Sequence, residues 1–205
     1  ALGLERPDKG TVRFLGEDIA SGTPERYAEF RRGVQVVFQN VQNSLNPRMT
    51  AGEIVGEPMR NFFGLSKKEA VERSRPLLEQ VGLKAADADK HPAQFSGGEL
   101  QRVCIARALA PNPRVVVFDE AVSSLDMLVQ ARVLKLIERI RDEQGLAFLF
   151  ISHDLRVVAG LCREVALMAD GVIAERRNSV RELVETGHPA IGALLASLPP
   201  PAPRR

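Results

Sequence analysis

Two hydrophobic periodicities alternate along this chain of 205 residues. Short apolar runs have the length of strands, and a run in which every residue is apolar indicates a strand buried on both faces. The predicted strands are Val34–Phe38, Val115–Phe118 and Ala147–Ile151, of which the last two are wholly apolar. Helical spacing is clearest over Met127–Glu143, before Gly145, with a stripe made of Leu128, Val133, Leu136, Ile137 and Ile140.

Capping and stop residues set the remaining boundaries. Ser66 and Glu69 form a capping box that begins a helix ending near Gly82, although Pro76 weakens the expectation of an unbroken helix. Asp170-Gly171 predicts a hairpin turn, and residues 40–50 have loop composition. The other predicted elements are a strand at Thr11–Leu15, helices at 51–63, Gly97–Ala110, from Leu155 and at 188–198, and hairpin strands at Val165–Met168 and Val172–Ala174.

This order of strands and helices predicts the fold class. Strand–helix–strand order with apolar strands is typical of an α/β fold with a mostly parallel sheet flanked by helices on both sides. The length suits a single domain spanning residues 1–205. Because ligands of such sheets bind beyond the carboxyl ends of the strands, we expect functional residues directly after the strands.

Composition disfavours several classes of protein and partner. Hydrophobic residues make up 44% and charged residues 26%, as in globular proteins. The net charge of +2 gives no reason to expect nucleic acid as a partner. No apolar run reaches membrane-spanning length, and the first residues lack the order of a signal peptide. Cys104 and Cys162 lie in apolar runs outside any CxxC motif, so we expect buried, reduced thiols of a cytosolic protein.

Two adjacent carboxylates, Asp119 and Glu120, follow the apolar strand Val115–Phe118. Acidic groups at the exit of a buried strand are costly unless they have a partner or a ligand. In P-loop NTPases an Asp at this place holds Mg²⁺, and a following Glu can polarise the attacking water. A strand-exit turn with two solvated acids explains the pair about equally well, so both interpretations stay open.

Ser152, His153 and Asp154 follow the strand Ala147–Ile151. His153 can point from the strand end towards a phosphate. Alternatively, the segment is a helix start with Ser152 as the N-cap and Asp154 in the first turn. A Ser–His–Asp catalytic set is disfavoured, because adjacent residues cannot converge and no nucleophile elbow precedes the Ser.

The segment Ser96-Gly97-Gly98-Glu99 opens a predicted helix. Ser96 and Glu99 fit a capping box, which is a sufficient structural reason for both. Two consecutive glycines weaken a helix by up to about 1 kcal/mol each, and a cap does not require them. Bare N–H groups at a helix N-terminus offer donors and a positive dipole to an anion, so phosphate binding is favoured.

Two further polar residues have both an ordinary and a functional explanation. Asp126 precedes the helix Met127–Glu143 and fits an N-cap. Gln39 follows the strand Val34–Phe38, so its amide lies at the carboxyl end of a strand, where it can ligate a metal or a water. For a lone Gln, the interpretation as a surface loop residue is favoured.

The order of these segments is more specific than any one of them. It resembles the ABC-type ATPase family over essentially the whole chain. The resemblance implies a P-loop NTPase-like (RecA-like) sheet with an ABC-type helical subdomain at about residues 50–110, part of an antiparallel β subdomain and a C-terminal tail from about residue 186. The segments that carry it are Gln39, Ser96 to Arg102, Val115 to Glu120, Ser123 to Asp126 and His153.

The resemblance also implies a role for each residue, with ATP as the substrate and Mg²⁺ as the metal. It assigns Mg²⁺ to Asp119 and Gln39. It assigns catalysis to Glu120 as the base, His153 as the switch histidine and Gln39 as the Q-loop glutamine. The residues that it assigns to nucleotide binding, on the ATP of a partner subunit, are Ser96, Gly97, Gly98, Glu99 and Asp126.

The chain departs from the family pattern in several respects. Phe95 and Glu99 replace the usual Leu and Gln, and Ala121 replaces a frequent Pro. These changes look tolerable, because backbone N–H groups and Ser96 do most of the binding. The chain also contains no GxxxxGK[ST] phosphate loop, and its start at Ala1–Pro7 has the composition of a last helix turn without an initiator Met. We therefore expect an N-terminally truncated sequence, inactive by itself, whose natural chain carries the phosphate loop and an adenine-stacking aromatic upstream.

Other segments resemble the peptide and nickel importer branch of the family, above all its nickel-import ATP-binding subunits. We expect a homo- or heterodimer that couples ATP hydrolysis to uptake of nickel or di/oligopeptides. Its partners would be permease subunits and, indirectly, an extracytoplasmic substrate-binding protein, and its place the cytoplasmic face of the plasma membrane. The alternatives are a soluble ABC ATPase not tied to transport and a catalytically dead regulatory fragment. The segments are Asn46–Thr50, Gly56–Met59, Arg102–Ala108 and Asp119–Ser123, while His188-Pro189 with Ala193–Leu195 resembles peptide importers.

Overall fold

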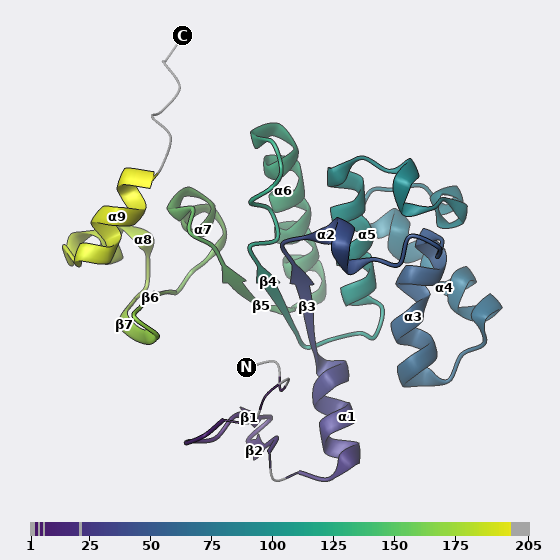
Figure 1. Ribbon diagram of the computed structural model, residues 1–205, viewed down its shortest axis with the longest axis horizontal. Helices are drawn as coiled ribbons and strands as arrows, with labels where there is room; N and C mark the ends of the chain where they lie inside the picture. The colour runs from purple at the N-terminus through teal and green to yellow at the C-terminus, as the bar shows by residue number, and fades with distance from the viewer. Residues whose placement is uncertain (1–2, 4, 6, 21, 198–205) are drawn as a thin grey trace. The chain divides into compact units, whose positions relative to one another are not determined.

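The computed structural model describes residues 3, 5, 7–20 and 22–197 of the chain (Figure 1). These residues belong to two compact units, Ala1–Leu149 and Phe150–Arg205, and each unit is described by itself. The tail predicted from Pro199 lies outside the described residues, as does most of the helix turn predicted at Ala1–Pro7.

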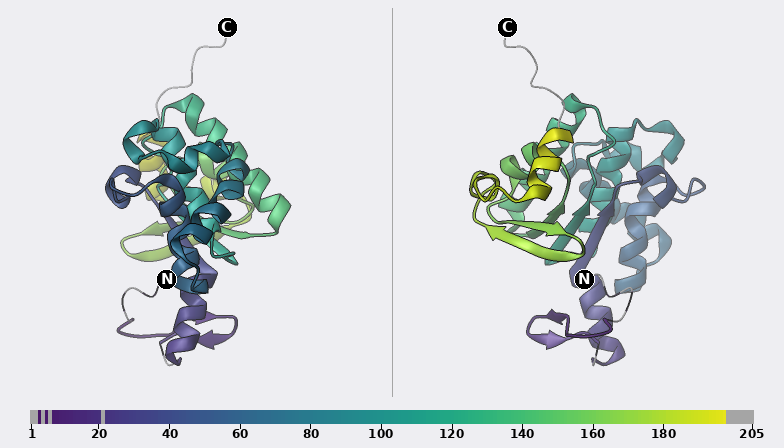
Figure 2. Two further views of the ribbon diagram at one scale, coloured as in Figure 1. Left: turned by 90° about the vertical axis from the view of Figure 1, so that its right-hand side faces the viewer. Right: turned by 60° about the vertical axis from the view of Figure 1, so that its left-hand side comes forward.

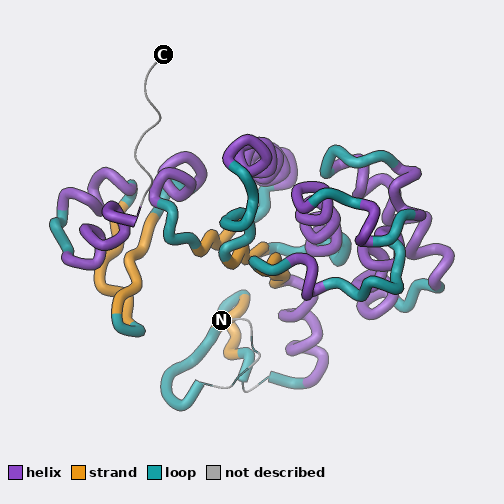
Figure 3. Tube along the Cα trace, turned by 45° about the horizontal axis from the view of Figure 1, so that its top comes forward, coloured by secondary structure: helices purple, strands orange, loops and turns teal. Residues whose placement is uncertain are grey.

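Three strands form the central sheet in the order β3-β4-β5, as labelled in Figure 1; Figure 3 draws the strands in orange. β3 (Val34–Phe38) and β4 (Val115–Asp119) pair in parallel, with Phe38 opposite Asp119. β5 comprises Ala147–Ile151. All three predicted strands are confirmed, and the parallel pairing follows from the helices that separate the strands in sequence, because parallel neighbours need a crossover connection.

Burial differs between these strands. Val116, Val117 and Phe118 of β4 are buried, as predicted for a wholly apolar strand. Phe118 packs edge-on against Phe148 of β5, with the ring centroids 5.1 Å apart. Leu149 of β5 is nevertheless 48% exposed. The prediction that β5 is buried on both faces is therefore wrong, because β5 is the last strand of the sheet in the described part of the chain.

An antiparallel hairpin and a helix precede the sheet. β1 (Arg13–Phe14) pairs with β2 (Glu17–Asp18), so the strand predicted at Thr11–Leu15 is shorter than expected. α1 (Pro24–Gly33) was not predicted, because charged residues occupy much of it and leave a narrow apolar face. Its N-cap hydroxyl, on Thr23, accepts a backbone hydrogen bond, which explains where it begins.

A layer of helices follows β3 along the chain (Figure 2). The predicted helix 51–63 is confirmed, and the helix that begins after the Ser66 capping box runs unbroken through Pro76. A four-residue helix falls within residues 40–50, so the prediction of loop for that whole segment is wrong. The elements of this layer are α2 (Val41–Ser44), α3 (Ala51–Phe63), α4 (Lys67–Gln80), η1 (Ala85–Asp89), η2 (Pro92–Gln94) and α5 (Gly97–Leu109).

Two glycines one helical turn apart bring α3 close to its neighbours. A Cβ atom on Gly56 would lie 2.9 Å from Ala70 Cβ and 3.0 Å from the Ala70 carbonyl oxygen. A Cβ atom on Gly52 would lie 3.0 Å from the Ala88 carbonyl oxygen. Real Cβ atoms essentially never show the first of these distances, and the 3.0 Å distances are tighter than most real Cβ contacts, so α4 and η1 approach α3 where it lacks side chains.

The amphipathic helix α6 (Met127–Gln144) connects β4 to β5. Val133, Ile137 and Ile140 are buried, which confirms most of the predicted stripe. Leu128 was assigned to the same stripe but is 64% exposed. It lies in the first turn of the helix, so helical spacing alone overestimated how far the buried face extends.

The second unit contains a hairpin and three helices. Asp170 and Gly171 both have positive φ, of 48° and 78°, which confirms the predicted hairpin turn. The core of the second unit consists of Leu155, Val165, Leu167, Leu183 and Ile191. The elements are α7 (Leu155–Leu161), β6 (Val165–Ala169), β7 (Val172–Arg177), α8 (Val180–Glu185), which was not predicted, and α9 (Pro189–Ser197).

Substituting Gly56 tests the close packing of α3 on α4. Gly56→Ala is expected to destabilise the protein by roughly 1–3 kcal/mol, because the new methyl group meets Ala70 backbone atoms that cannot rotate away. Urea unfolding followed by circular dichroism measures the change.

Gly192→Ala is the matched control, because a Cβ atom at that position of α9 meets nothing within 4 Å. This variant is expected to be neutral or more stable by up to about 1 kcal/mol, since Ala favours a helix over Gly. Equal stability of Gly56→Ala and the wild type would contradict the close contact.

Candidate functional site

Polar side chains meet where β3 and β4 end side by side. Since Phe38 pairs with Asp119, the residues that follow, Gln39 and Glu120, leave the sheet at the same edge. Gln39 Nε2 donates a hydrogen bond to Ser123 Oγ at 3.2 Å, and Ser123 Oγ donates to the Glu120 carbonyl oxygen at 2.8 Å. The structure therefore brings Gln39 and the acidic pair together, through a serine.

Ser123 is the member of this group that sequence reasoning did not assign to the site. Its partner Gln39 is 84 residues away in the chain, so no local pattern predicts their contact. The sequence feature that could have indicated Ser123 is its place in Ser123–Asp126, one of the segments that resemble the family.

Glu120 has an unusual backbone conformation. Its φ of 51° lies in the left-handed region, which residues other than glycine rarely adopt. Such a conformation costs on the order of 1–3 kcal/mol and is concentrated at functional sites. Glu120 is also half-buried. Both observations favour a functional role over a fully solvated strand-exit turn.

The turn Ser96–Glu99 is closed by a complete capping box. The Glu99 carboxylate accepts hydrogen bonds from the Ser96 N–H and from the Ser96 hydroxyl, each at 2.8 Å. Ser96 Oγ in turn accepts from the Glu99 N–H at 3.4 Å. The hydrogen bond from the Ser96 N–H is the largest cause that lowers the pKa of Glu99, and the bond from the Ser96 hydroxyl lowers it further. The cap accounts for Ser96 and Glu99 structurally, which leaves the glycines between them to be explained.

The two glycines of this turn differ in their surroundings. A Cβ atom on Gly98 would lie 2.3 Å from Val129 Cγ1 of α6, so packing within the chain explains this glycine. A Cβ atom on Gly97 would meet nothing within 4 Å. Gly97 is exposed, and its backbone can be approached closely from outside.

Lys90 interacts with Phe95 and Glu99, the two residues of this segment that differ from the family pattern. Its Nζ lies 2.7 Å from Asp87 Oδ1 and 5.7 Å from the centroid of the Phe95 ring, within cation–π distance. The hydrogen bond from Lys90 is the largest cause that lowers the pKa of Asp87, and the same pair raises the pKa of Lys90. The Lys90 charge also favours the ionised form of Glu99. Phe95 and Glu99 therefore both suit a turn beside a lysine.

Asp126 is the N-cap of α6. Its Oδ1 accepts hydrogen bonds from the N–H groups of Leu128 and Val129, at 3.1 and 3.0 Å. The N-cap interpretation is confirmed, and the predicted nucleotide contact is not tested by it. Oδ2 makes neither of these bonds, so the cap does not by itself prevent a second role.

His153 belongs to the second unit, where it is exposed and precedes the N-cap residue of α7. The N-cap of α7 is Asp154, which accepts from the Arg156 N–H at 2.9 Å, so the suggestion of Ser152 as the N-cap is wrong. Ser152 Oγ instead accepts from the Asp154 N–H at 3.0 Å. The Arg156 guanidinium holds the pKa of Asp154 below its usual value. These bonds fix the backbone on the C-terminal side of His153.

The acidic residues at the strand ends fit one kind of metal site. Among the described residues, no three His, Cys, Asp or Glu side chains lie close enough together to hold a metal ion by themselves. Mg²⁺ in nucleotide sites is bound by one or two carboxylates together with phosphates and waters. Asp119 and Gln39, at the ends of paired strands, are a donor set of that size.

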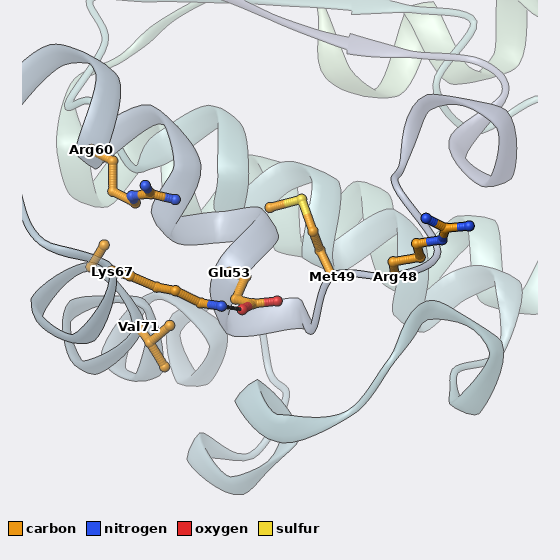
Figure 4. Close-up of a pocket in the computed structure, with 7 residues that line it drawn as sticks. Arg48, Met49, Glu53, Arg60, Lys67 and Val71 are labelled. Carbon is orange, nitrogen blue, oxygen red and sulfur yellow. Dashed lines mark ion pairs between the residues drawn. The ribbon is translucent and has the colours of Figure 1, made fainter.

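A basic pocket lies on the helical layer of the first unit (Figure 4). The cavity of about 260 Å³ has an apolar part formed by Met49, Ala70 and Val71. Lys67 and Glu53 form an ion pair at its wall. The lining is completed by two exposed arginines with no ion pair among the described residues, Arg48 and Arg60. We call this the basic pocket; the sequence did not predict it.

A parallel sheet with acidic and amide groups at its strand ends, in a chain that also has an exposed glycine at a helix start, is typical of nucleotide-hydrolysing α/β domains. The chain belongs to the ABC transporter family, whose model matches residues 1–123. It is an ABC-type ATPase domain, which confirms the resemblance and the α/β fold class.

Known relatives agree with this assignment. The chain is 44% identical over 202 residues to a nickel import ATP-binding protein of Rhodospirillum rubrum, covering 98% of this chain and 73% of the relative. A solved structure of cbiO1 from Clostridium perfringens, part of the ABC transporter complex cbiONQ, matches with a TM-score of 0.77 at 25% identity, over 95% of this chain and 79% of that one. The ATP-binding cassette MJ0796, solved as a dimer in a post-hydrolysis state bound to ADP and Pi, matches with a TM-score of 0.71 at 27% identity, over 85% of this chain and 75% of that one.

Two further expectations concern the membrane and the cysteines. Within the described residues, none of the helices has both the length and the apolarity to cross a bilayer. Cys104 is buried and free, and burial raises the pKa of its thiol to about 11, so it is an unreactive core residue. Cys162 forms no disulfide and is only partly buried, which corrects the expectation of full burial.

Substitutions of Asp126 separate its cap from any other role. Asp126→Asn is expected to keep the stability of the protein, because the amide oxygen accepts the same two N–H groups. Asp126→Ala should lose about 1 kcal/mol, as other N-cap deletions do. Chemical denaturation measures both variants. Loss of ATPase activity in a stable Asp126→Asn protein would indicate a nucleotide role, and equal stability of the Ala variant would contradict the cap.

Proposed function

We propose that this chain is the ATP-hydrolysing subunit of an ABC importer. One observation carries the proposal: Gln39 is hydrogen-bonded through Ser123 to Glu120 at the carboxyl ends of two paired strands. Membership of the ABC transporter family supports ATP as the substrate. The left-handed backbone of Glu120 is consistent with a residue held in place for chemistry.

Glu120 is the general base in this proposal. A water attacks the γ-phosphorus, the bond to ADP breaks, and the proton of the water passes to the Glu120 carboxylate. Gln39 donates from its amide nitrogen to Ser123, so its amide oxygen is the atom that would accept from the water or ligate the metal. Asp119 and Gln39 would hold Mg²⁺, which would neutralise charge on the phosphates, and His153 would contact the γ-phosphate.

The Ser96–Glu99 turn binds the ATP of a second subunit. Gly97 offers an exposed backbone without a side chain, at the N-terminus of a 13-residue helix whose dipole favours an anion. Asp126 would lie at the same subunit interface. The dimeric form in which MJ0796 was solved supports a face-to-face pair of subunits, whether identical or different.

The helical subdomain, at about residues 50–110, is the part that meets the permease. The basic pocket supports this assignment, because two exposed arginines beside an apolar wall suit a segment that carries both acidic and apolar side chains. The protein would then be bound at the cytoplasmic face of the plasma membrane without crossing it, and an extracytoplasmic substrate-binding protein would deliver the cargo.

The cargo follows from the relatives alone, since the site itself contacts only nucleotide. The Rhodospirillum rubrum relative is a nickel import ATP-binding protein, so we propose nickel, with di- or oligopeptides as the second candidate. Uptake of radioactive nickel should fall when the gene is deleted. Unchanged nickel uptake with lost dipeptide uptake would give peptides as the cargo. Normal uptake of both would favour a soluble ATPase not tied to transport.

Glu120→Gln tests the catalytic assignment in the natural full-length protein. It is expected to reduce ATP turnover by about a hundredfold or more while ATP-dependent dimerisation persists, because the amide cannot accept the proton. Phosphate release and light scattering with ATP measure the two properties. Glu57→Gln, on the exposed side of α3, is the control and should leave turnover unchanged. Turnover of the Glu120→Gln variant at the wild-type rate would contradict the assignment of Glu120 as the base. Absence of turnover in the wild-type protein itself would favour the catalytically dead fragment.

Charge reversal tests the basic pocket as a permease contact. The double variant Arg48→Glu/Arg60→Glu should weaken co-purification with the permease by about tenfold, because an acidic partner is repelled. Arg73→Glu, exposed on α4 and outside the pocket lining, is the matched control and should keep wild-type association. Equal recovery of the permease with both variants would rule out the pocket as the docking place.

A further inference from the structure

The first turn of α5 lies against the first turn of α6 at Gly98. A Cβ atom on Gly98 would lie 2.3 Å from Val129 Cγ1, 3.7 Å from its Cβ and 4.0 Å from its Cγ2. The space beside Gly98 is therefore filled by a single methyl group of α6. If that methyl group were absent, the next atom would be at an ordinary contact distance.

Val129 has little freedom to move away from this contact. Its backbone N–H is held by the Asp126 carboxylate at 3.0 Å, which fixes the first turn of α6. A valine side chain in a helix strongly prefers one rotamer, so rotation of its methyl group is restricted. A stiff side chain on a capped helix start defines a position more sharply than a long flexible one does.

We propose that Val129 is a positioning residue for the Ser96–Glu99 turn, which it holds through its contact with Gly98. The proposal rests on the proposed function, in which this turn binds the ATP of a second subunit. Gly98 is a glycine because Val129 occupies its side-chain space, whereas Gly97 is a glycine because the ligand approaches its backbone.

The contact between Val129 and Gly98 connects the strand-end residues of one subunit with its Ser96–Glu99 turn. Ser123, which is bonded to Gln39 and to the Glu120 carbonyl, precedes Asp126 by three residues. Asp126 caps α6 and thereby places Val129 against Gly98. The strand-end residues and the turn that serves the partner's nucleotide are therefore connected by the short segment from Ser123 to Val129.

Substitutions in the natural full-length protein test this contact by rescue. Gly98→Ala should lower kcat/KM for ATP by about tenfold, because the new methyl group displaces the turn. Val129→Ala should lower kcat/KM by about threefold, mainly through KM, since the turn is no longer held. The double variant Gly98→Ala/Val129→Ala should recover to the level of Val129→Ala alone, because the added Cβ then lies 3.7 Å from its nearest neighbour.

Two further variants separate positioning from general stability. Val129→Thr keeps the branched shape and should keep KM close to the wild-type value, whereas an effect due only to burial of apolar surface would raise KM in this variant as well. Gly97→Ala should abolish ATP-dependent dimerisation at unchanged unfolding midpoint, and Val129→Ala should not rescue it. If Gly98→Ala does not fold, the comparison of Val129→Ala with Val129→Thr decides the proposal.

The outcomes distinguish failure of this inference from failure of the function. Two results would overturn the role of Val129 if the wild type is active. One is a wild-type KM in Val129→Ala, and the other is a double variant whose kcat/KM does not exceed that of Gly98→Ala. A wild type that neither hydrolyses ATP nor dimerises with it overturns the proposed function itself.

Discussion

The register between β3 and β4 is the constraint on which the candidate site depends. Because Phe38 pairs with Asp119, the two strands end at the same level, and the chain leaves both at one edge of the sheet. A shift of one residue would move every side chain of β3 to the other face and would separate Gln39 from Ser123. Val37, which is buried, opposes such a shift, since it would be moved to the other face of the sheet. The hydrophobic core therefore fixes the distance between polar groups that do not themselves contribute to it.

The Ser96–Glu99 turn, the other part of the candidate site, is positioned by helices that approach one another closely. On α3, Gly52 and Gly56 allow neighbouring backbones to come within about van der Waals contact, and on α5 Gly98 does the same for a methyl group of Val129. In each case the glycine lies at a point where two elements meet, and the cost in helix propensity is offset by packing. Gly97 is different, because nothing in the described structure explains its missing side chain. An unexplained glycine at an exposed helix start is better evidence for a ligand than the pair of glycines is.

Charge is arranged around these fixed points. Lys90 holds Asp87, lies over Phe95 and favours the ionised form of Glu99, so the loop before α5 is neutralised locally. The basic pocket contains the opposite arrangement, with arginines that have no ion pair in the described chain. Unlike the loop, the pocket has an apolar wall beside its exposed arginines, a combination that suits a partner segment with acidic and apolar side chains.

The sequence by itself determined the local elements. Apolar runs located β3, β4 and β5, capping residues located α4, and Asp170-Gly171 located the hairpin turn, because each depends on neighbours in the chain. The order of the motifs also determined the family. Tertiary structure decided the rest: Leu149 is exposed in spite of an apolar strand, Pro76 lies within a continuous helix, and Asp154, not Ser152, caps α7. It alone brought Gln39 to Ser123 across 84 residues and Val129 to Gly98, because contacts between distant segments depend on how the elements pack and not on any local pattern.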